Sequence, residues 1–361
     1  MCKAETLKNK LGKLSHSAPL SENHITKKWS SGDINKPLVS IVCHTYNHVE
    51  FIKDSLNGFL SQITSFPFEI IINDDASDDG TSEVIKKYHS RFPNLIKPIF
   101  HKENQYSKGF SPRRFSFPRV RGKYIALCEG DDYWTSSVKL EAQVEEFVEG
   151  VSLVFHDSVR IYGGGDYILS ESYYEANKPI NGYTPFQMAS GCKIPTASSM
   201  FLAEPVLSSA NIDVINGDHL LWAILASSGR AKFINKRMSA YRHHSGGVWS
   251  GRNASSKIEP ALKSRKVIFK VVEKKFKSAA LLGLLSTMFE IFKEMSTIGE
   301  AGKARLVLRS SYTNFSKMVC KCSFRDKKSL RYIFRSLKLL LIRYPLFIFI
   351  FNKNNLIERR K

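Results

Sequence analysis

The sequence has no long, uninterrupted apolar segment. Residues 1–23 lack the apolar stretch of a signal peptide, so the sequence does not indicate export. The most apolar piece, residues 339–351, is interrupted by Arg343 and Pro345, whereas a helix needs about 20 apolar residues to cross a bilayer. We therefore expect a cytoplasmic protein without a membrane-spanning helix.

Cysteine is sparse, and neither a disulfide framework nor a zinc site is indicated. Cys43 and Cys128 lie in apolar, strand-like runs, where a buried thiol is the ordinary interpretation. Cys320 and Cys322 have no second cysteine or histidine pair at zinc-finger spacing, so we do not expect them to bind metal. The reducing cytoplasm is the default compartment for such a chain.

Acidic residues are scarce in the last hundred residues. Residues 261–361 contain 24 lysines and arginines but 6 acidic residues, a net charge of +18. Residues 1–260 contain the other 30 basic and 27 acidic side chains, a net charge of +3. This contrast predicts a domain boundary, which we place after residue 251.

The predicted C-terminal region, residues 252–361, mixes basic with bulky apolar residues, as in 263–277 and 330–351. Such a mixture is typical of helices that lie in a lipid interface, whereas a nucleic-acid-binding face would have fewer aliphatic side chains. We therefore expect basic amphipathic helices that associate peripherally with the anionic inner face of the cytoplasmic membrane, and no nucleic acid partner. The alternative is a helical bundle that only packs on the rest of the chain.

Residues 37–251 contain strand-like and helix-like segments in alternation. Short β-rich apolar runs are separated by segments with apolar residues at helical spacing. This pattern is typical of βαβ units, so we predict an α/β domain with a mainly parallel sheet, preceded by a flexible polar arm over residues 1–36. The expected strands are 38–43, 68–72, 96–100, 123–128, 151–156, 160–169 and 196–203, and the expected helices are 52–63, 81–92, 217–229 and one that begins at Ser136 or Ser137 and buries Val138, Val144, Phe147 and Val148.

Polar clusters follow three of these strands, at residues 44–48, 73–81 and 129–132. The carboxyl ends of parallel strands meet at one edge of a sheet, and ligands bind there. The last cluster places Glu129 and Asp131 beside Asp132, and such carboxylates repel one another unless something positive lies between them. The sequence therefore predicts a ligand site at this edge.

Two known acidic-loop motifs do not fit the second cluster. A calcium-binding EF-hand loop that begins at Asp75 would need Glu at its twelfth position, where the chain has Lys86. A phosphatase of the haloacid-dehalogenase type needs a nucleophilic Asp two residues before the Asp-Gly-Thr of 79–81, and the chain has Ser77 there. Neither calcium binding nor phosphoryl transfer is supported.

Three motifs together resemble those of the family-2 inverting glycosyltransferases, which have the GT-A fold. They are "VSIVCHTYNH" (39–48), "FEIIINDDASDDGT" (68–81) and "RGKYIALCEGDDYW" (121–134), in this order and at suitable spacing. The resemblance covers residues 37–250 and implies a Rossmann-like mixed, mainly parallel sheet flanked by helices. It also implies transfer of a sugar from a nucleotide-sugar donor, expected to be a UDP-sugar, to a hydroxyl of a glycan or lipid-linked acceptor.

The resemblance assigns the donor-binding residues. Thr45 and Asp75 correspond to the residues that hold the nucleoside. Glu129 and Asp131 correspond to the family's Asp-x-Asp motif, which binds the ribose and a divalent cation, either Mg²⁺ or Mn²⁺. Glu129 departs from the usual Asp and reaches one methylene further, so Asp131 is the expected metal ligand. Supporting roles are expected for Asn47, Asp74 and Asp132.

An inverting transfer also needs a general base for the acceptor hydroxyl. The resemblance places it at the start of a late helix, where Asp218 precedes an apolar run; the alternative is an ordinary helix N-cap. His244, with His243 as its rival, matches the family's mobile segment over the diphosphate and is the second expected metal ligand; the alternative is a surface histidine in a loop. Four arginines before the fourth strand are expected to form a solvated basic face, although one of them could contact the diphosphate: Arg113, Arg114, Arg119 and Arg121.

The biological setting that the resemblance implies is the assembly of cell-surface polysaccharide or lipopolysaccharide. A sugar-nucleotide nucleotidyltransferase is an alternative, but that class has a Gly-rich basic loop after its first strand, where this chain has residues 44–48. The second alternative is an inactive adaptor at the membrane surface. The joint presence of Asp75, Glu129, Asp131 and Asp218 argues against the adaptor.

Overall fold

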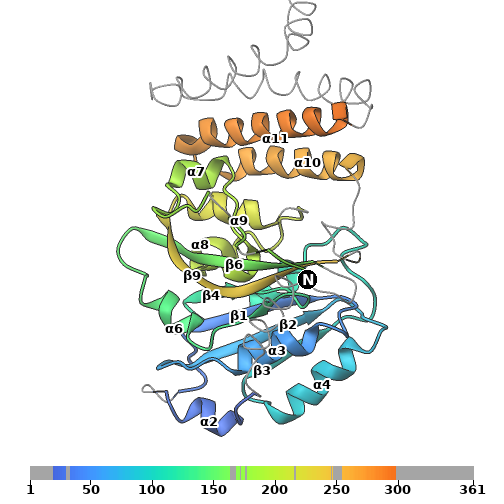
Figure 1. Cartoon of the computed structure of the whole chain (residues 1–361), viewed down its shortest axis with the longest axis vertical. Coiled ribbons are helices and arrows are strands. Elements are labelled where there is room, and N and C mark those ends of the chain that lie inside the picture. The colour runs from blue at the N-terminus through green and yellow to red at the C-terminus, as the bar shows by residue number, and fades with distance from the viewer. Residues whose placement is uncertain are drawn as a thin grey trace, which may run out of the picture. The chain divides into compact units, whose positions relative to one another are not determined.

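The computed structural model describes residues 19–29, 33–162, 168–170, 172–174, 177–214, 217–244, 246 and 254–297 (Figure 1). The chain divides into two compact units, one comprising Met1–Met188 and Cys192–Gly251 and the other comprising Ala189–Gly191 and Arg252–Lys361. Among the described helices, none is long and apolar enough to cross a membrane. The basic segment 330–351, expected at the membrane surface, lies outside the described residues.

The first unit begins with the parallel half of a nine-stranded sheet, in the strand order β3-β2-β1-β4. These strands are Val39–Thr45 (β1), Phe68–Asp74 (β2), Ile96–Phe100 (β3) and Tyr124–Leu127 (β4). They run parallel to one another. Every residue of β2 and β4 is buried, as are all but one in β1, because both faces of this part of the sheet are covered.

The helices between the parallel strands explain the apolar spacing in the sequence. Helix α3, Ile52–Leu60, buries Ile52, Leu56, Phe59 and Leu60, whereas α4, Thr81–Arg91, is more exposed. Gly58 of α3 is required by close packing, because a Cβ there would lie 2.9 Å from the carbonyl oxygen of Trp134. The helix predicted to start at Ser136 or Ser137 is shorter than expected.

This shorter helix, α6, spans Lys139–Val144. Val138 and Val148, which the apolar spacing places on its buried face, are 47% and 52% exposed. The correction follows from length: the helix ends at Val144, so Val148 lies beyond it, and Val138 precedes its first turn. The apolar face that remains is too short to include either side chain.

The other half of the sheet follows β4 in the order β8-β6-β9-β5, with β7 paired to β6. Strands β4 and β8 are antiparallel, while the long strands β6 and β9 run parallel to each other. Strand β6 contains the whole of the predicted strand 151–156 and the first three residues of the predicted strand 160–169, whose last two residues lie in β7. The segment expected as a strand at 196–203 is a 3₁₀ turn followed by a short strand. The bounds are Tyr133–Trp134 (β5), Val151–Tyr162 (β6), Ile168–Ser170 (β7), Thr196–Ser198 (η2), Met200–Leu202 (β8) and Arg230–His243 (β9).

The first unit also contains short helices. They are Glu22–Thr26 (α2), Arg113–Ser116 (α5), Phe117–Arg119 (η1), Glu204–Leu207 (α8) and Gly217–Leu225 (α9), together with the first four residues of Pro185–Ser190 (α7), whose last two residues belong to the second unit. Around α2, Ile25 and Trp29 are buried, and the Trp29 indole donates a hydrogen bond to Thr64 Oγ1 at 3.1 Å. This described piece of residues 1–36 is therefore anchored by its apolar side chains, unlike the flexible arm that its polarity predicts.

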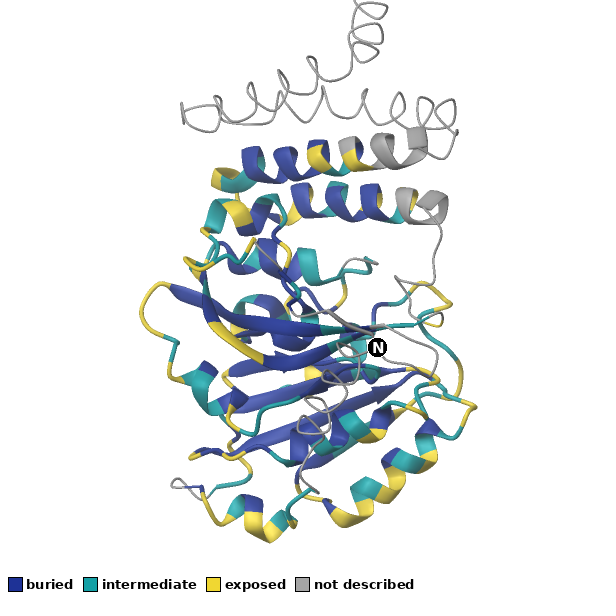
Figure 2. Ribbon diagram, viewed as in Figure 1, coloured by how far each residue is buried: buried dark blue, intermediate teal, exposed yellow. Residues whose placement is uncertain are grey.

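In the second unit, the described residues form the helices Ala254–Val271 (α10) and Lys277–Thr297 (α11), joined by a turn of 3₁₀ helix at Lys274–Phe276 (η3). Figure 2 shows the buried positions on both helices. In α10 the buried apolar residues alternate with exposed basic ones such as Lys263 and Lys270. The Arg265 guanidinium donates to Thr287 Oγ1 at 3.0 Å, which links the two helices. Helix α10 is thus amphipathic and basic where it is described.

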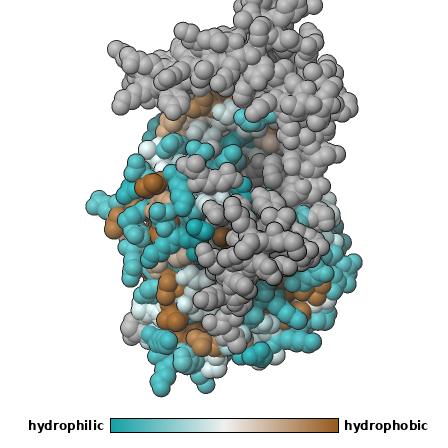
Figure 3. All heavy atoms as spheres, in the orientation of Figure 1, coloured by the Kyte–Doolittle hydropathy of each residue, from teal (hydrophilic) through white to brown (hydrophobic). Residues whose placement is uncertain are grey.

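On the face shown in Figure 3, hydrophilic residues cover most of the described surface. The core of the first unit nevertheless contains a lysine side chain. Lys139 is fully buried, its ammonium group donates to the Gln143 side chain, and it lies 4.0 Å from the centre of the Trp134 ring. Burial lowers the pKa of Lys139 from 10.5 to about 7.

We predict that Lys139→Met stabilises the protein at neutral pH. Between about pH 7 and 10.5 the unfolded chain keeps the Lys139 proton that the folded chain has lost, so this lysine costs less stability as the pH rises. The variant should raise the free energy of unfolding at pH 7 by roughly 1–4 kcal/mol, and by less at pH 9.5. Urea unfolding at both pH values measures this, with the exposed Lys53→Met as a control. A gain that is equal at both pH values, or a loss, contradicts the prediction.

Candidate active site

The three polar clusters meet at the carboxyl edge of the parallel strands. Thr45 at the end of β1 lies opposite Asp74 at the end of β2. The turn after β4 continues the pairing with β1, because the Gly130 N–H donates to the His44 carbonyl oxygen at 2.9 Å. The acidic turn 129–132 therefore lies directly beside the end of β1.

Glycine at position 130 permits this close approach. A Cβ there would lie 2.5 Å from Thr45 Oγ1, which is shorter than any normal contact. From the other side, the Ser55 hydroxyl of α3 lies 3.0 Å from the Gly130 carbonyl oxygen and 2.6 Å from that of Asp132. The backbone of the acidic turn is thus fixed by neighbours on β1 and α3.

Arg242, near the end of β9, contacts the acidic turn at several points. Its guanidinium donates to the Asp131 carbonyl oxygen at 2.8 Å and forms an ion pair with Asp54 of α3. Its backbone N–H donates to Asp132 Oδ1 at 2.9 Å. One residue therefore ties the acidic turn to β9 and to α3.

Aromatic rings cover the Arg242 guanidinium. It lies 4.4 Å from the centre of the Tyr133 ring and 5.1 Å from that of Phe51, and its side chain is 7% exposed. Cations over aromatic faces are attracted by the ring quadrupole, more so when water is excluded. Because side chains two residues apart in a strand point to the same side, the position of Arg242 also directs His244 toward the turn.

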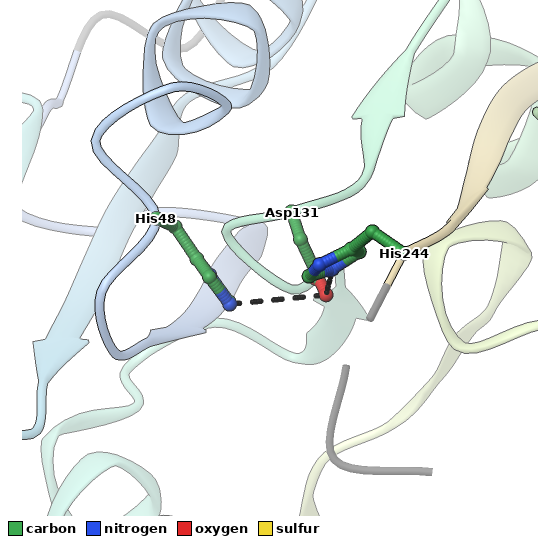
Figure 4. A group of neighbouring side chains, drawn as sticks. All are labelled: His48, Asp131 and His244. Atoms are coloured by element: carbon green, nitrogen blue, oxygen red, sulfur yellow. Dashed lines mark hydrogen bonds and ion pairs between the residues drawn. The ribbon is translucent and has the colours of Figure 1, made fainter. Parts of the chain in front are cut away.

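Asp131 faces two histidines (Figure 4). Its Oδ2 lies 3.0 Å from His244 Nε2 and 3.8 Å from His48 Nε2. Burial disfavours the ionised form of Asp131, but the hydrogen bond with His244 and the neighbouring His48 outweigh it and lower the pKa of Asp131. All three side chains remain 15–18% exposed, so a ligand can reach them.

Glu129 titrates in the opposite direction. Burial, together with the charges of Asp131 and Asp218, raises the pKa of Glu129 to about 8. The Glu129 side chain is nevertheless more accessible to solvent than those of Asp131 and Asp132. The carboxylate of Asp218, in the first turn of α9, is one of the charges that raise the pKa of Glu129.

Arg113 of α5 holds the chain segment that leads into α9. It is 3% exposed, and its guanidinium donates to the carbonyl oxygens of Gly217 at 2.7 Å and of Ile212 at 3.1 Å. Burial lowers the pKa of Arg113 to about 10, against the opposing effect of Asp218 and Asp213. Arg113 therefore remains a cation at neutral pH and fixes the first turn of the helix that carries Asp218.

Asp132 is the most deeply buried of the three carboxylates in the turn. It is 1% exposed, and no described residue donates a hydrogen bond to its Oδ2. Burial, and then the charges of Asp131 and Glu129, raise the pKa of Asp132 well above its usual value. Its Oδ1 accepts a hydrogen bond from the backbone N–H of Arg242, so Asp132 holds the turn against β9.

The two residues expected to hold the nucleoside are buried. Thr45 is 4% exposed, and its hydroxyl lies 3.2 Å from His48 Nδ1. Asp75 is 5% exposed, and its two carboxylate oxygens accept the backbone N–H groups of Gln105 at 2.7 Å and Tyr106 at 2.9 Å. In this structure Asp75 therefore anchors the loop after β3, and both nucleoside contacts remain predictions.

Asn47 and Asp74 organise the loop after β2. The Asn47 amide exchanges hydrogen bonds with Asp78, at 2.9 Å to its carboxylate and 3.1 Å from its N–H. Asp74 accepts hydrogen bonds from the hydroxyls of Ser77 and Ser82. These contacts hold the loop after β2 in place, and the supporting roles of the two residues in donor binding remain predictions.

The expectation of a solvated basic face before β4 is wrong for Arg113, which is buried as described above, whereas Arg119 and Arg121 are exposed. Arg114 pairs with Asp213 at 2.6 Å, and Arg121 pairs with the buried Glu69 at 2.6 Å. These acceptors could not be recognised from the sequence, because they lie about 50 to 100 residues away along the chain.

Sequence reasoning also missed three residues of the site: His48, Arg113 and Arg242. His48 lies in the same polar cluster as Thr45 and could have been found there. His244 directly follows strand β9 and lies two residues after Arg242. Side chains two residues apart along an extended chain point to the same side, so Arg242 could have been found from His244. Arg113 had no such signal, because its role depends on a loop about 100 residues further along.

Comparison with known proteins agrees with this geometry. The sequence model for the family described as "Glycosyl transferase family 2" matches residues 40–201. The glucosyltransferase WfaP of Escherichia coli, named for the use of UDP-Glc and an α-D-GlcNAc-diphosphoundecaprenol acceptor, is 30% identical over 214 residues, 58% of this chain and 79% of WfaP. The chain belongs to glycosyl transferase family 2.

Other similarities extend the comparison. The uncharacterized protein Rv1520 of Mycobacterium tuberculosis is 33% identical over 213 residues, and the match covers 58% of this chain and 60% of Rv1520. The structure of S. aureus TarS residues 1–349 with UDP-GlcNAc aligns with a TM-score of 0.58 at 16% identity, over 78% of this chain and 81% of that chain. This likeness confirms the predicted GT-A α/β fold with a mainly parallel sheet flanked by helices. Family membership disfavours the nucleotidyltransferase alternative.

We predict that Arg242→Met destabilises the protein more than Asp54→Asn does. The first change removes the donor to the Asp131 carbonyl oxygen and should lower the free energy of unfolding by about 1–3 kcal/mol. The second acts on a carboxylate that is 42% exposed, so less than about 1 kcal/mol is expected. Chemical denaturation of both variants tests the difference, and equal losses would show that Arg242 acts only through its ion pair.

Proposed function

We propose that this glycosyltransferase transfers a sugar, with inversion and with a divalent cation, from a nucleotide-sugar donor to a hydroxyl acceptor. The supporting observation is the division of roles among three carboxylates at the same sheet edge. Asp131 faces two histidines, and its pKa is lowered. The pKa of Glu129 is raised to about 8, and the charge of Asp218 contributes to that rise. A donor site and a proton acceptor are thus adjacent.

The residues present fit a divalent cation. Asp131 and His244 offer an oxygen and a nitrogen 3.0 Å apart, both accessible to a ligand, and these two residues would hold the ion. Bound there, the cation would act as a Lewis acid that stabilises the departing diphosphate. Asp132 and Arg242 keep the backbone of Asp131 in place for this task.

Asp218 would act as the general base. In a single displacement, the acceptor oxygen forms a bond to the anomeric carbon while the bond from that carbon to the diphosphate oxygen breaks. Asp218 takes the proton that the acceptor hydroxyl loses. Because the pKa of Glu129 is raised to about 8, Glu129 is largely protonated at pH 7 and adds little repulsion to the ionised Asp218.

Arg113 would position this base. Its two hydrogen bonds to the carbonyl oxygens of Gly217 and Ile212 fix the entrance to α9. Gly217 leaves the space for this contact, because a Cβ there would lie 2.9 Å from the Arg113 guanidinium. The two residues form one unit that holds Asp218 at the sheet edge.

We further propose a UDP-sugar donor and a lipid-linked glycan acceptor in cell-surface polysaccharide assembly. WfaP, which covers the same region, carries a UDP-sugar and a diphosphoundecaprenol acceptor in its name. The excess positive charge after residue 261 supports peripheral association with the anionic, cytoplasmic face of the membrane that would present such an acceptor.

The direct test of this function is nucleoside diphosphate release. The full chain is incubated with a panel of nucleotide sugars, Mn²⁺ or Mg²⁺, and membrane extract as the acceptor source. We expect release with a UDP-sugar, sugar incorporation into the lipid fraction, sedimentation of the protein with the membranes, and at least about a 100-fold loss after chelation that added cation restores. Release of pyrophosphate from nucleoside triphosphate and sugar phosphate would indicate a nucleotidyltransferase, and no release at all would favour an inactive adaptor.

Replacement of the proposed base tests the chemical step. Asp218→Asn should lower the transfer rate by about 10²- to 10⁴-fold, because the amide cannot accept the proton. Donor affinity, measured by calorimetry, should stay within about twofold, and the exposed Asp33→Asn should leave both quantities unchanged. Near-normal transfer by Asp218→Asn would rule out this residue as the base and leave it as a helix cap.

A further inference from the structure

We propose that His48 joins Asp131 and His244 in a preformed two-histidine, one-carboxylate site that binds a first-row transition ion, Mn²⁺ in particular, in preference to Mg²⁺. The proposal adds a ligand and a class of metal to the function proposed above. It rests on that function only for the use of the ion in turnover, because binding itself needs neither donor nor acceptor.

The spacing of the three side chains suits one ion. One ligand atom from each residue lies within 4.8 Å of the other two. Ligand atoms about 2.1 Å from a metal are about 3.0 Å apart at a right angle and about 3.4 Å apart at a tetrahedral angle. The separations from Asp131 Oδ2, 3.0 Å to His244 and 3.8 Å to His48, lie close to these values.

The ligands come from three structural elements whose positions are fixed. His48 follows β1, Asp131 follows β4 and His244 follows β9, and Figure 4 shows both rings turned toward the carboxylate. His48 Nδ1 shares a hydrogen bond of 3.2 Å with the Thr45 hydroxyl, which leaves Nε2 toward Asp131. A hydrogen bond at the second ring nitrogen is the usual way in which proteins orient a histidine ligand.

Packing supports the same arrangement. The Phe51 ring lies 4.9 Å from that of His244 and 6.4 Å from that of His48, measured between ring centres. The two imidazole rings are 6.2 Å apart and nearly perpendicular. The ligands are therefore held by an apolar neighbour before any ion binds.

A second set of neighbouring carboxylates, Glu129, Asp131 and Asp132, is less suitable. Asp132 is 1% exposed and its Oδ1 already accepts a hydrogen bond from Arg242. An ion bound to Asp132 would lie away from the accessible side of the turn. Asp131 is common to both sets, so the histidines decide which side of it the ion occupies.

The chemistry of the ligands decides the class of metal. Mg²⁺ is a hard cation that takes oxygen ligands and keeps several waters. Imidazole nitrogen favours first-row transition ions, and carboxylate oxygen suits Mn²⁺. Two imidazoles and one carboxylate thus disfavour Mg²⁺ while leaving positions open on Mn²⁺ for donor oxygens.

The test is a titration of the full chain with Mn²⁺, followed by the loss of the electron paramagnetic resonance signal of the free ion and repeated in excess Mg²⁺. We expect Mn²⁺ binding without nucleotide, little displacement by a 100-fold excess of Mg²⁺, and at least about tenfold weaker binding by His48→Gln. His48→Asp, which replaces nitrogen by oxygen, should bind Mn²⁺ but lose much of the preference over Mg²⁺.

The matched control is His101→Gln, a histidine after β3 at the same sheet edge whose Nε2 pairs with Asn73. This variant should bind Mn²⁺ like the unaltered chain, and thermal unfolding should show that all variants fold. Unchanged Mn²⁺ affinity in His48→Gln, or no binding by the unaltered chain, would overturn the proposal. Because the titration involves no sugar transfer, its outcome is separate from that of the nucleoside diphosphate assay.

Discussion

The site depends on one constraint: three carboxylates lie within four residues at the end of a buried strand, and their charges must be balanced there. Arg242 supplies the first part of the balance, through the Asp131 carbonyl oxygen and the Asp132 carboxylate. Burial supplies the second part, because it raises the pKa values of Glu129 and Asp132 and so favours their uncharged forms. Only Asp131 is left as a full negative charge toward solvent, and its neighbours there are histidines.

The parallel half of the fold could be predicted because its information is local. Continuous apolar runs give β1, β2 and β4, and the polar residues that follow them must meet at one edge once the strands are parallel. The motifs in this half were specific enough to indicate the family. The other half was harder, because β6 and β9 continue through polar residues, and several of these, such as Asp157 and Ser239, are buried.

The contacts that arrange the site could not be predicted, because they join residues distant in sequence. Arg242 is 111 residues from Asp131, and His244 is 113 residues from its partner carboxylate. Arg113 is 104 residues from Gly217. A basic residue in a short motif is normally predicted to be exposed. Only the folded chain shows that Arg113 and Arg242 are buried with hydrogen-bond acceptors around them. Apolar spacing misled in a similar way, because it placed Val138 and Val148 on the buried face of a helix that is too short to bury them.

Two neighbouring carboxylates show how environment separates chemical roles on one turn. Glu129 and Asp131 differ by two residues, yet the pKa of the first is raised and that of the second is lowered. Burial raises both pKa values, and the difference arises from what each group faces: Glu129 meets the charges of Asp131 and Asp218, whereas Asp131 meets His244 and His48. A pair of acids whose pKa values are driven apart can keep one group ionised for a cation and the other neutral beside a base.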